Sequence, residues 1–379
     1  MRPASDAERA RLAATFAELC RIPSPFGHER ACADRVAAEL RGMGFSVEED
    51  DAAGPAGAEC GNLLARFDPR RARSERTILL CAHLDTVDTS TPVDPVIVEE
   101  GWENAHDGIL GADNKAAVAV MLEAARRISV EGSPVGVELL FTVSEENALA
   151  GAKAFDAGKL RSEFGYVFDH ASPIGEVVLA SPTYYRLTAE FHGRAAHAGI
   201  RPEEGRSAIL AAAHAVAAMP HGRIDAETTA NVGSIAGGVG STNIVAERCR
   251  LLAEARSLDA ARVETVIAQM VDAVNDGASA AECDVDVTTE RLFEGYRTRP
   301  TAPAVVAAEA ALRETGYEPR RIVTGGGSDA NALAVSGFEC VNLANGTERN
   351  HEPTERVSVA ALDGMLDVCL ALLDEAARV

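Results

Sequence analysis

The sequence predicts an α/β fold, with a mostly parallel sheet covered by helices on both faces and an inserted α+β ferredoxin-like domain. Two observations predict it. Apolar stretches typical of strands alternate with amphipathic stretches typical of helices in the first and last parts of the chain. Between them, two helical stretches lie among four longer strand-like stretches in the order β-α-β-β-α-β. We therefore expect a discontinuous domain, 1–178 and 296–379, and an inserted domain, 179–295.

The first part of the chain supplies the alternation of helices and strands. The elements expected here are, in order, helices over 6–20 and 28–43, strands over 45–49, 62–67 and 76–82, a loop over 88–110 with one hairpin-like stretch, a helix from Asp113 to about 128, the strand VGVELLFTV, a short helix and the strand FGYVF. Hydrophobic periodicity indicates each type, and Pro and Gly mark the turns. Strands that alternate with helices favour a parallel sheet.

The inserted part has longer strand-like stretches. Those expected are EVVLASPTYYRLTAEFHG, TTANVGSI, TNIVAERCRLLAEARSL and DVDVTTERLF, with helices in EGRSAILAAAHAVAAMP and over 260–276. After Pro300 the first pattern returns, with a helix, the strand RRIVTGG, a helix, the strand FECVNLA, a loop and a final helix. The segments before and after the insertion are therefore expected to form one domain.

Composition excludes several kinds of partner. The formal net charge is −22 at pH 7, whereas nucleic acids and anionic membranes bind basic surfaces. No apolar run approaches the roughly 18 residues of a membrane span, and the first twenty residues lack the apolar core of a signal peptide. The eight cysteines include no C-x-x-C pair. We expect them to be reduced in a cytoplasmic protein that binds neither nucleic acid nor membrane.

Acidic and histidine side chains fall where the expected strands end. They are His83, Asp85, Asp113, Glu145, Glu146, Asp169 and His351. In an open α/β sheet, ligands gather at this edge. Two histidines and three or four carboxylates can hold two divalent metal ions that share one water. The pattern therefore predicts a hydrolase with a two-metal centre.

Charge arithmetic supports a set of metal ligands. If Asp113, Glu146 and Asp169 are ionised ligands of two Zn²⁺ ions, one positive charge is left in excess, and a shared hydroxide cancels it. His83 and His351 complete the set as neutral ligands, because zinc accepts imidazole nitrogen and carboxylate oxygen together.

Glu145 and Asp85 are then left for other roles. We expect Glu145 to take the proton of the shared water. Asp85 follows His83 by two residues, so both side chains of an extended segment leave from the same face. The carboxylate of Asp85 can then accept the second ring N–H of His83, as residues behind a metal-bound histidine commonly do.

Each member of this set has an ordinary alternative. A His-x-Asp pair at one strand end is usually polar surface, and two adjacent glutamates are usually the solvated start of a helix. Asp113 could be only a helix N-cap, and His351 in a loop has no individual claim. Recurrence after successive strands is what favours a metal site.

Five stretches carry a family resemblance that covers essentially the whole chain. They are GRAAHAG, GRIDAETTANVGSIAGG, TNIVAERCRLLAEARSLD, GGGSDAN and NGTERNHEPTERVS. Together with the strand-end residues they resemble the dinuclear zinc exopeptidases and amidohydrolases, the family of tripeptidase T, acetylornithine deacetylase and succinyl-diaminopimelate desuccinylase. The tripeptidase-T-like branch is the most similar.

The resemblance implies how the two metals are shared. His83, Asp113 and Asp169 would bind one ion. Glu146 and His351 would bind the other, with Asp113 bridging the two. Zinc is the expected metal, and Mn²⁺ or Co²⁺ are alternatives. The peptide bond that follows Asp113 is expected to be cis.

For the inserted domain the resemblance implies a lid through which two chains form a homodimer. His197 would donate a hydrogen bond to the oxyanion, and Asn243 would lie beside that oxyanion. Arg256 would pair with a substrate carboxylate. His197 could instead be a surface histidine, and Arg256 could form an ion pair with Glu254 or Asp259.

The stretch VTGGGSDANAL could bind an anion. Glycines before a helix expose backbone N–H groups, so a substrate carboxylate is expected near Gly326, Gly327 and Ser328. A glycine turn closed by a serine cap is the alternative. No lysine follows the glycines, which excludes a Walker loop.

These expectations describe a zinc-dependent aminopeptidase that cleaves short peptides, with Glu145 carrying a proton from water to the leaving amine. An N-acyl amino-acid deacylase or a carboxypeptidase of the same family is the first alternative, since such enzymes also cleave an amide beside a carboxylate. A non-catalytic metal-binding protein is the second. It is disfavoured because a protein that only binds metal has no need of Glu145.

Overall fold

The computed structural model describes residues 1–67, 74–88 and 91–379, so residues 89–90 of the expected 88–110 loop lie outside it. The chain divides into two compact units. Unit 1 consists of Met1–Ala180 and Arg297–Val379, and unit 2 of Ser181–Tyr296. The expected boundaries, after residues 178 and 295, lie within two residues of these. Unit 1 is thus assembled from two segments, and unit 2 is inserted between them.

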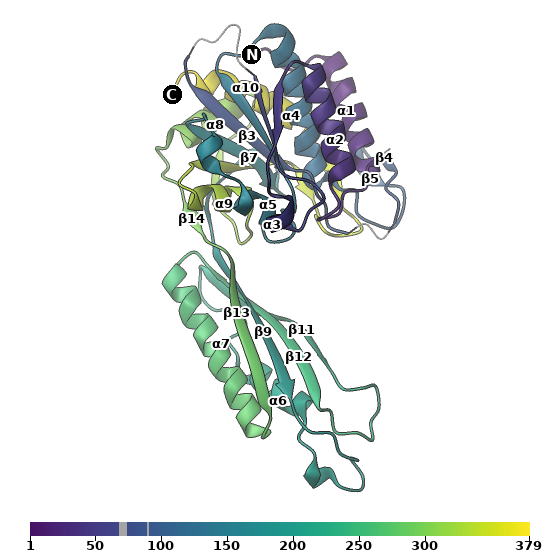
Figure 1. The fold of residues 1–379 in the computed structure, drawn as a ribbon. Coiled ribbons are helices and arrows are strands. Elements are labelled where there is room, and N and C mark those ends of the chain that lie inside the picture. Colours follow the sequence, from purple (N-terminus) through teal and green to yellow (C-terminus); the bar gives the residue numbers. More distant parts are fainter. Residues whose placement is uncertain (68–73, 89–90) are drawn as a thin grey trace. The chain divides into compact units, whose positions relative to one another are not determined.

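A nine-stranded sheet forms the centre of unit 1 (Figure 1). Its strands are β1 (Ser46–Glu49), β2 (Leu63–Phe67), β3 (Thr77–His83), β6 (Gly136–Thr142), β7 (Phe164–His170), β8 (Glu176–Ser181), β14 (Tyr296–Arg297), β15 (Arg320–Val323) and β16 (Cys340–Ala344). The order is β1-β2-β6-β3-β7-β16-β8-β14, with β15 beside β8. The pairs β3–β6, β3–β7, β7–β16 and β8–β15 are parallel. The prediction of a mostly parallel sheet is confirmed.

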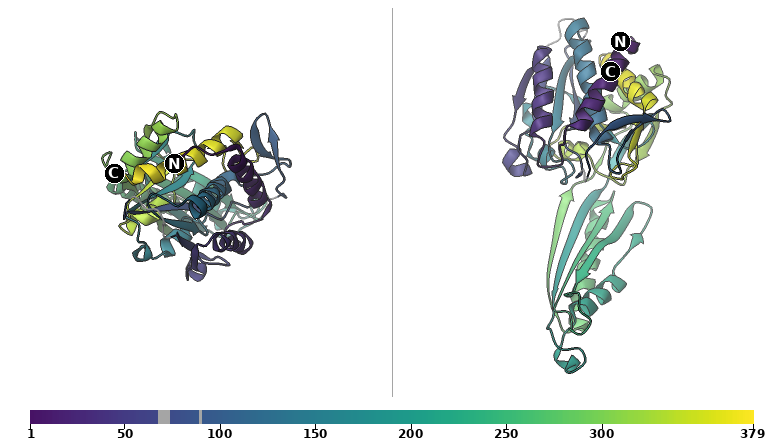
Figure 2. Two further views of the ribbon diagram at one scale, coloured as in Figure 1. Left: turned by 90° about the horizontal axis from the view of Figure 1, so that it is seen from above. Right: turned by 90° about the vertical axis from the view of Figure 1, so that its right-hand side faces the viewer.

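Helices flank this sheet and bury its central strands. They are α1 (Asp6–Arg21), α2 (Arg30–Gly42), α3 (Ala53–Ala56), α4 (Ala112–Glu131), α5 (Ala150–Ala154), the 3₁₀ turn η1 (Ala157–Lys159), α8 (Pro303–Glu314), α9 (Asp329–Val335) and α10 (Val359–Ala376). Helices α4 and α8 pack on one face of β7 and α9 on the other (Figures 1 and 2). All seven residues of β6 are buried, as expected for a strand that helices cover on both faces.

A small four-stranded sheet supports the loop that carries His351. Its strands are β4 (Pro95–Val98), β5 (Gly101–Asn104), β17 (Thr347–Glu348) and β18 (Arg356–Ser358), in the order β17-β18-β5-β4. The first two form the hairpin expected within 88–110. His351 lies between β17 and β18, so paired strands hold both ends of its loop.

Unit 2 is an antiparallel sheet with two helices. Its elements are β9 (Thr183–His192), the 3₁₀ turn η2 (Pro202–Glu204), α6 (Ala208–Ala218), β10 (Gly222–Arg223), β11 (Thr228–Gly237), β12 (Arg248–Ser257), α7 (Ala260–Ala280) and β13 (Asp284–Phe293). The order β10-β11-β12-β9-β13 follows the expected β-α-β-β-α-β chain path, with β10 added. Apolar side chains of both helices and of the sheet form one core. None of the helices described in either unit is long and apolar enough to cross a membrane.

Two strands differ from the expectation. EVVLASPTYYRLTAEFHG forms two strands that part at Pro182, because proline has no N–H to continue the ladder. The strand expected from Thr242 begins only at Arg248. The residues before it bond elsewhere: the carbonyl of Asn243 accepts the N–H of Ala198, and the N–H of Val245 donates to the carbonyl of Ala196.

Candidate metal centre

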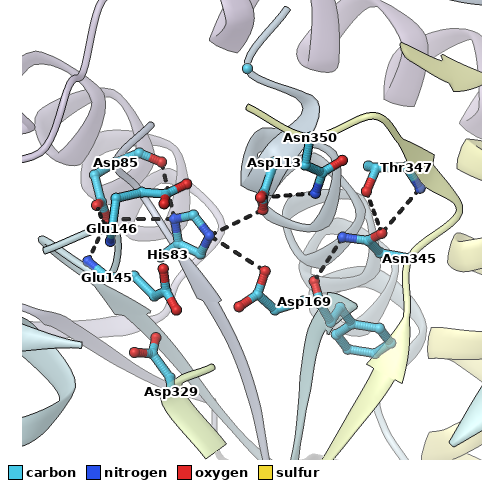
Figure 3. Close-up of polar contacts among 12 residues, drawn as sticks. His83, Asp85, Asp113, Glu145, Glu146, Asp169, Asp329, Asn345, Thr347 and Asn350 are labelled. Carbon is cyan, nitrogen blue, oxygen red and sulfur yellow. Dashed lines mark hydrogen bonds and ion pairs between the residues drawn. The ribbon is translucent and has the colours of Figure 1, made fainter. Parts of the chain in front are cut away.

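Six of the predicted residues meet at one edge of the large sheet, and Figure 3 labels all of them except His351. They come from the carboxyl ends of β3, β6 and β7, the start of α4 and the loop between β17 and β18. They are His83, Glu145, Glu146, Asp169, Asp113 and His351. Strands β6, β3 and β7 are neighbours and run parallel, so their carboxyl ends lie together. This is the edge at which such sheets bind ligands.

Asp113 faces both histidines. Its Oδ1 lies 3.2 Å from His83 Nε2, and its Oδ2 lies 3.5 Å from His351 Nε2. His83 Nε2 also lies 3.5 Å from Asp169 Oδ1, and His351 Nε2 lies 2.8 Å from Glu146 Oε1. Burial alone would raise the pKa of Asp113, but hydrogen bonds with the two imidazoles hold it well below its ordinary value. The ionised carboxylate of Asp113 thus faces two groups of possible metal ligands, one around His83 and one around His351.

Three groups of three side chains could each hold a metal ion, and two of these groups share Asp113. One consists of His83, Asp113 and Asp169, and in the other Asp113 lies with Glu146 and His351. In each group the donor atoms lie within 4.8 Å of one another. One imidazole nitrogen and two carboxylate oxygens are a suitable donor set for catalytic zinc. The residues present therefore fit a divalent metal ion.

The charge of the cluster also favours a cation. Burial, and then the charge of Asp113, raises the pKa of Asp169 well above its ordinary value. Burial, and then Asp169, does the same for Glu145. Hydrogen bonds with Asp113 and Glu146 raise the pKa of His351 to about 10. Groups that hold protons in this way release them when a divalent cation binds.

Asp85 fixes the segment that carries both glutamates. It is fully buried, and its carboxylate accepts the backbone N–H groups of Glu145 and Glu146, each at 3.0 Å. Its Oδ1 lies 3.4 Å from His83 Nδ1, whereas its backbone oxygen lies 3.0 Å from the same nitrogen. The structure thus places Asp85 against His83. It adds hydrogen bonds from the backbone of the two glutamates, which were not expected from the sequence.

The start of α4 holds Asp113 in irregular backbone. Gly111, at a φ of 76°, holds the N-cap position, and Asp113 and Asn114 follow with non-helical dihedral angles. The peptide bond between Asp113 and Asn114 is cis, as the resemblance implied. The side-chain oxygens of Asp113 face His83, His351 and Asn350, as a metal ligand requires.

Four polar residues around the centre were not identified from the sequence. They are Glu29, Asp329, Asn350 and Glu355, and the three carboxylates among them are buried. Asn350 Nδ2 donates to Asp113 Oδ2 at 2.8 Å, and Asp329 accepts the hydroxyl of Thr142. Asp329 and Glu355 stand within GGGSDAN and NHEPTERVS, the two motifs that already carried the resemblance. Their presence in these motifs was the signal that could have found them.

The glycine stretch at 325–327 has the alternative arrangement. Ser328 is the N-cap of α9 and forms a capping box with Asn331. The N–H of Gly326 donates to Thr324 Oγ1 at 3.0 Å, and the N–H of Ser328 donates to Asn331 Oδ1 at 3.1 Å. These bonds are those of a glycine turn closed by a serine cap. Binding of a substrate carboxylate by Gly326, Gly327 and Ser328 stays a prediction.

In unit 2 the structure brings His197 and Asn243 side by side. His197 forms an antiparallel bridge with Ile244, and the N–H of Ala198 donates to the carbonyl of Asn243 at 2.9 Å. Both predicted residues are exposed. Their roles as oxyanion contacts stay predictions.

Arg256 forms the ion pair with Glu254 that was expected as an alternative to binding the substrate carboxylate. Its Nε lies 3.0 Å from Glu254 Oε1, and its Nη2 lies 3.2 Å from Glu254 Oε2. The guanidinium also stacks on Tyr184, with its carbon 4.1 Å from the ring centroid. Binding of a substrate carboxylate by Arg256 stays a prediction.

Several known proteins are similar to this chain over nearly its whole length. The aminopeptidase PepT of Bacillus cereus is 35% identical, with a TM-score of 0.86, over 97% of this chain and 99% of that one. A tripeptidase of Staphylococcus aureus is 33% identical, with a TM-score of 0.91, over 98% and 99%. The uncharacterized protein YqjE of Bacillus subtilis is 36% identical over 97% of this chain and 99% of its own length.

Two family models match parts of the chain. Residues 62–179 match Peptidase family M28, and residues 183–282 match the Peptidase dimerisation domain. The fold and the cluster of ligands define a metallopeptidase. The chain belongs to the family of metal-dependent exopeptidases that includes the aminopeptidase PepT. The predictions of this family and of a metal-dependent exopeptidase are confirmed.

Proposed function

We propose that the protein is a zinc-dependent aminopeptidase that removes the N-terminal residue of short peptides and binds two metal ions in each chain. One observation carries the proposal: the two carboxylate oxygens of Asp113 face different histidines, His83 and His351. Two-metal hydrolases hold their ions about 3.5–4 Å apart, and a shared carboxylate suits that spacing. The substrate class is supported by the aminopeptidase and the tripeptidase to which the chain is similar.

The two groups of side chains would each hold one ion. His83 and Asp169 would bind the first, Glu146 and His351 the second, and Asp113 both. Bound there, divalent ions polarise the scissile carbonyl and lower the pKa of the attacking water. Mn²⁺ or Co²⁺ could replace zinc, because these ions also accept imidazole and carboxylate.

Glu145 is the proposed general base. It takes a proton from the attacking water and returns it to the leaving amine. Its carboxylate lies within 4.8 Å of the donor atoms of His83 and Glu146, close to both groups. The hydrogen bond between its backbone N–H and Asp85 holds it there.

His197 and Asn243 are the proposed contacts of the oxyanion that forms during the reaction. An oxyanion needs donors fixed in advance, and an exposed imidazole beside an exposed amide can supply them. The adjacency of the two segments in unit 2 supports this pairing.

We also propose that the protein is a homodimer formed through unit 2. Among the described residues, β10 covers β11 only near Ala230, which leaves the rest of that edge for pairing. Large apolar side chains near it are exposed, namely Ile209, Leu210 and Ile235 at 43%, 50% and 50%. The match to the Peptidase dimerisation domain also supports a second copy of this chain as the partner. Sedimentation velocity would test it, since Leu210→Asp should yield a monomer.

A cytoplasmic location is part of the proposal. All eight cysteines are free thiols, and seven of them are buried. Thiols persist in a reducing compartment. Burial also raises the pKa of Cys20 and Cys340 above its ordinary value, so neither is a reactive thiolate.

Mass spectrometry of cleavage products would test the function. The zinc-loaded protein would be given matched tripeptides with free, N-acetylated or C-amidated ends, and N-acetyl amino acids. We expect loss of the N-terminal residue only where the amine is free. Cleavage of the N-acetyl substrates instead would make the protein a deacylase or a carboxypeptidase.

A further inference from the structure

Glu355 joins the loops that carry Asp113 and His351. It lies four residues after His351 and is only 2% exposed. Its Oε2 accepts the backbone N–H groups of Leu110 and Gly111, at 2.9 and 2.8 Å. Its Oε1 accepts the backbone N–H of Asp113 at 2.8 Å. Both oxygens of this buried carboxylate therefore accept hydrogen bonds from the loop that carries Asp113, the proposed bridging ligand.

The loop before α4 needs such an acceptor. Gly111 has a φ of 76°, and Asp113 and Asn114 have non-helical dihedral angles, so this backbone is irregular. Buried N–H groups of irregular backbone must find partners outside regular structure. A carboxylate that accepts several of them forms charge-assisted bonds, which are stronger than neutral ones.

The same residue is anchored on the side of His351. The N–H of Glu355 donates to the carbonyl of Glu352 at 2.9 Å, within the turn that follows His351. The next residues form β18, in which Val357 pairs with Trp102 of β5. A shift of Glu355 would therefore disturb the loops on both sides.

We propose that Glu355 is a positioning residue of the metal centre, which ties the backbone of Asp113 to the loop of His351. The inference rests on the proposed two-metal function. Asn350 and His351 also contact Asp113, but through side chains at the centre itself. Glu355 instead holds the two loops together through backbone N–H groups. The side-chain atoms of Asp113 and His351 are then free to bind metal.

Glu355→Gln would test this role with little change in size. The amide keeps one acceptor oxygen and turns an NH₂ group towards backbone N–H groups, so the loop of Asp113 must move. We expect zinc affinity to fall about 10- to 100-fold, as is typical when residues behind metal ligands are replaced. Glu355→Asp keeps both oxygens on a shorter side chain, so its loss should be smaller.

Glu138→Gln is a matched control. Glu138 is 1% exposed, and its Oε2 accepts the backbone N–H groups of Arg161 and Ser162, each at 2.9 Å. It serves a different loop and belongs to neither metal group. We expect this variant to lose thermal stability while zinc affinity stays unchanged.

The experiment is a zinc titration of the metal-free protein in competition with a chromophoric chelator, repeated for each variant. The absorption spectrum of the cobalt-loaded protein would report ligand geometry, and we expect it to change in the Glu355 variants only. Wild-type zinc affinity and cobalt spectra in both Glu355 variants would overturn the proposal. Absence of zinc binding by the wild-type protein would instead refute the metal centre itself.

Discussion

The metal-ligand residues of unit 1 and the predicted substrate contacts of unit 2 differ in how the chain holds them. His83 is 1% exposed, and hydrogen bonds surround it and Asp113. His197 and Asn243 are exposed, and within the described parts of the chain the hydrogen bonds of their side chains reach only Gly199 and Ser241, two residues away. The fold alone therefore organises the predicted metal ligands, whereas the proposed function requires a bound substrate or a second chain to order the exposed residues of unit 2.

Metal removal should have the largest effect on activity, and it should affect the backbone of unit 1 but not that of unit 2. A chelator is expected to abolish peptide cleavage, and added zinc should restore it, because the ions supply the polarised carbonyl and the activated water. Hydrogen exchange would check the location. We expect faster exchange around Asp113 and His351 without metal, and no change in α6 and α7. Equal changes in both units would show that the metal also organises unit 2.

Glu145→Gln should remove chemistry without removing metal. General-base catalysis contributes about 10²–10⁴-fold, so kcat on a free tripeptide should fall by that factor. Zinc content should stay at the wild-type level. Glu163→Gln is the control, because Glu163 is exposed and pairs with Arg76 away from the centre. Retained kcat in Glu145→Gln would rule out the proposed base.

His197→Ala should give the next largest loss. Removal of one donor to an oxyanion commonly costs about 10²–10³-fold in kcat. Zinc affinity should not change, since His197 belongs to neither group of ligands. His221→Ala, at another exposed histidine of unit 2, should keep wild-type kcat. If His197→Ala behaved like that control, the oxyanion role would be excluded.

Arg256→Gln should have the smallest effect. The guanidinium pairs with Glu254, and partly exposed pairs of this kind contribute about 0–1 kcal/mol to the free energy of unfolding. Arg256 is also the predicted contact of the substrate carboxylate, so the preference for tripeptides with a free over an amidated C-terminus should weaken, as measured by kcat/KM on both. Persistence of that preference would instead assign Arg256 to its ion pair.

Four of the six residues at the candidate metal centre could be predicted because each lies at or just beyond the carboxyl end of a strand whose apolar pattern is visible in the sequence. His83 and Asp169 lie at the ends of β3 and β7, and the two glutamates follow β6. Glu355 could not be found in this way. A buried carboxylate that accepts backbone N–H groups produces no periodicity, and its partners at 110–113 lie more than 240 residues away. The exposed residues of unit 2 could be suggested only by resemblance.

Native mass spectrometry of the zinc-titrated protein would show whether two ions share Asp113, because it counts the ions bound to each chain. If Asp113 is shared between two ions, the wild-type chain should bind two zinc ions, and Asp113→Asn should lose affinity at both sites together. One ion per wild-type chain, or two ions held by Asp113→Asn with unchanged affinity, would contradict the shared ligand.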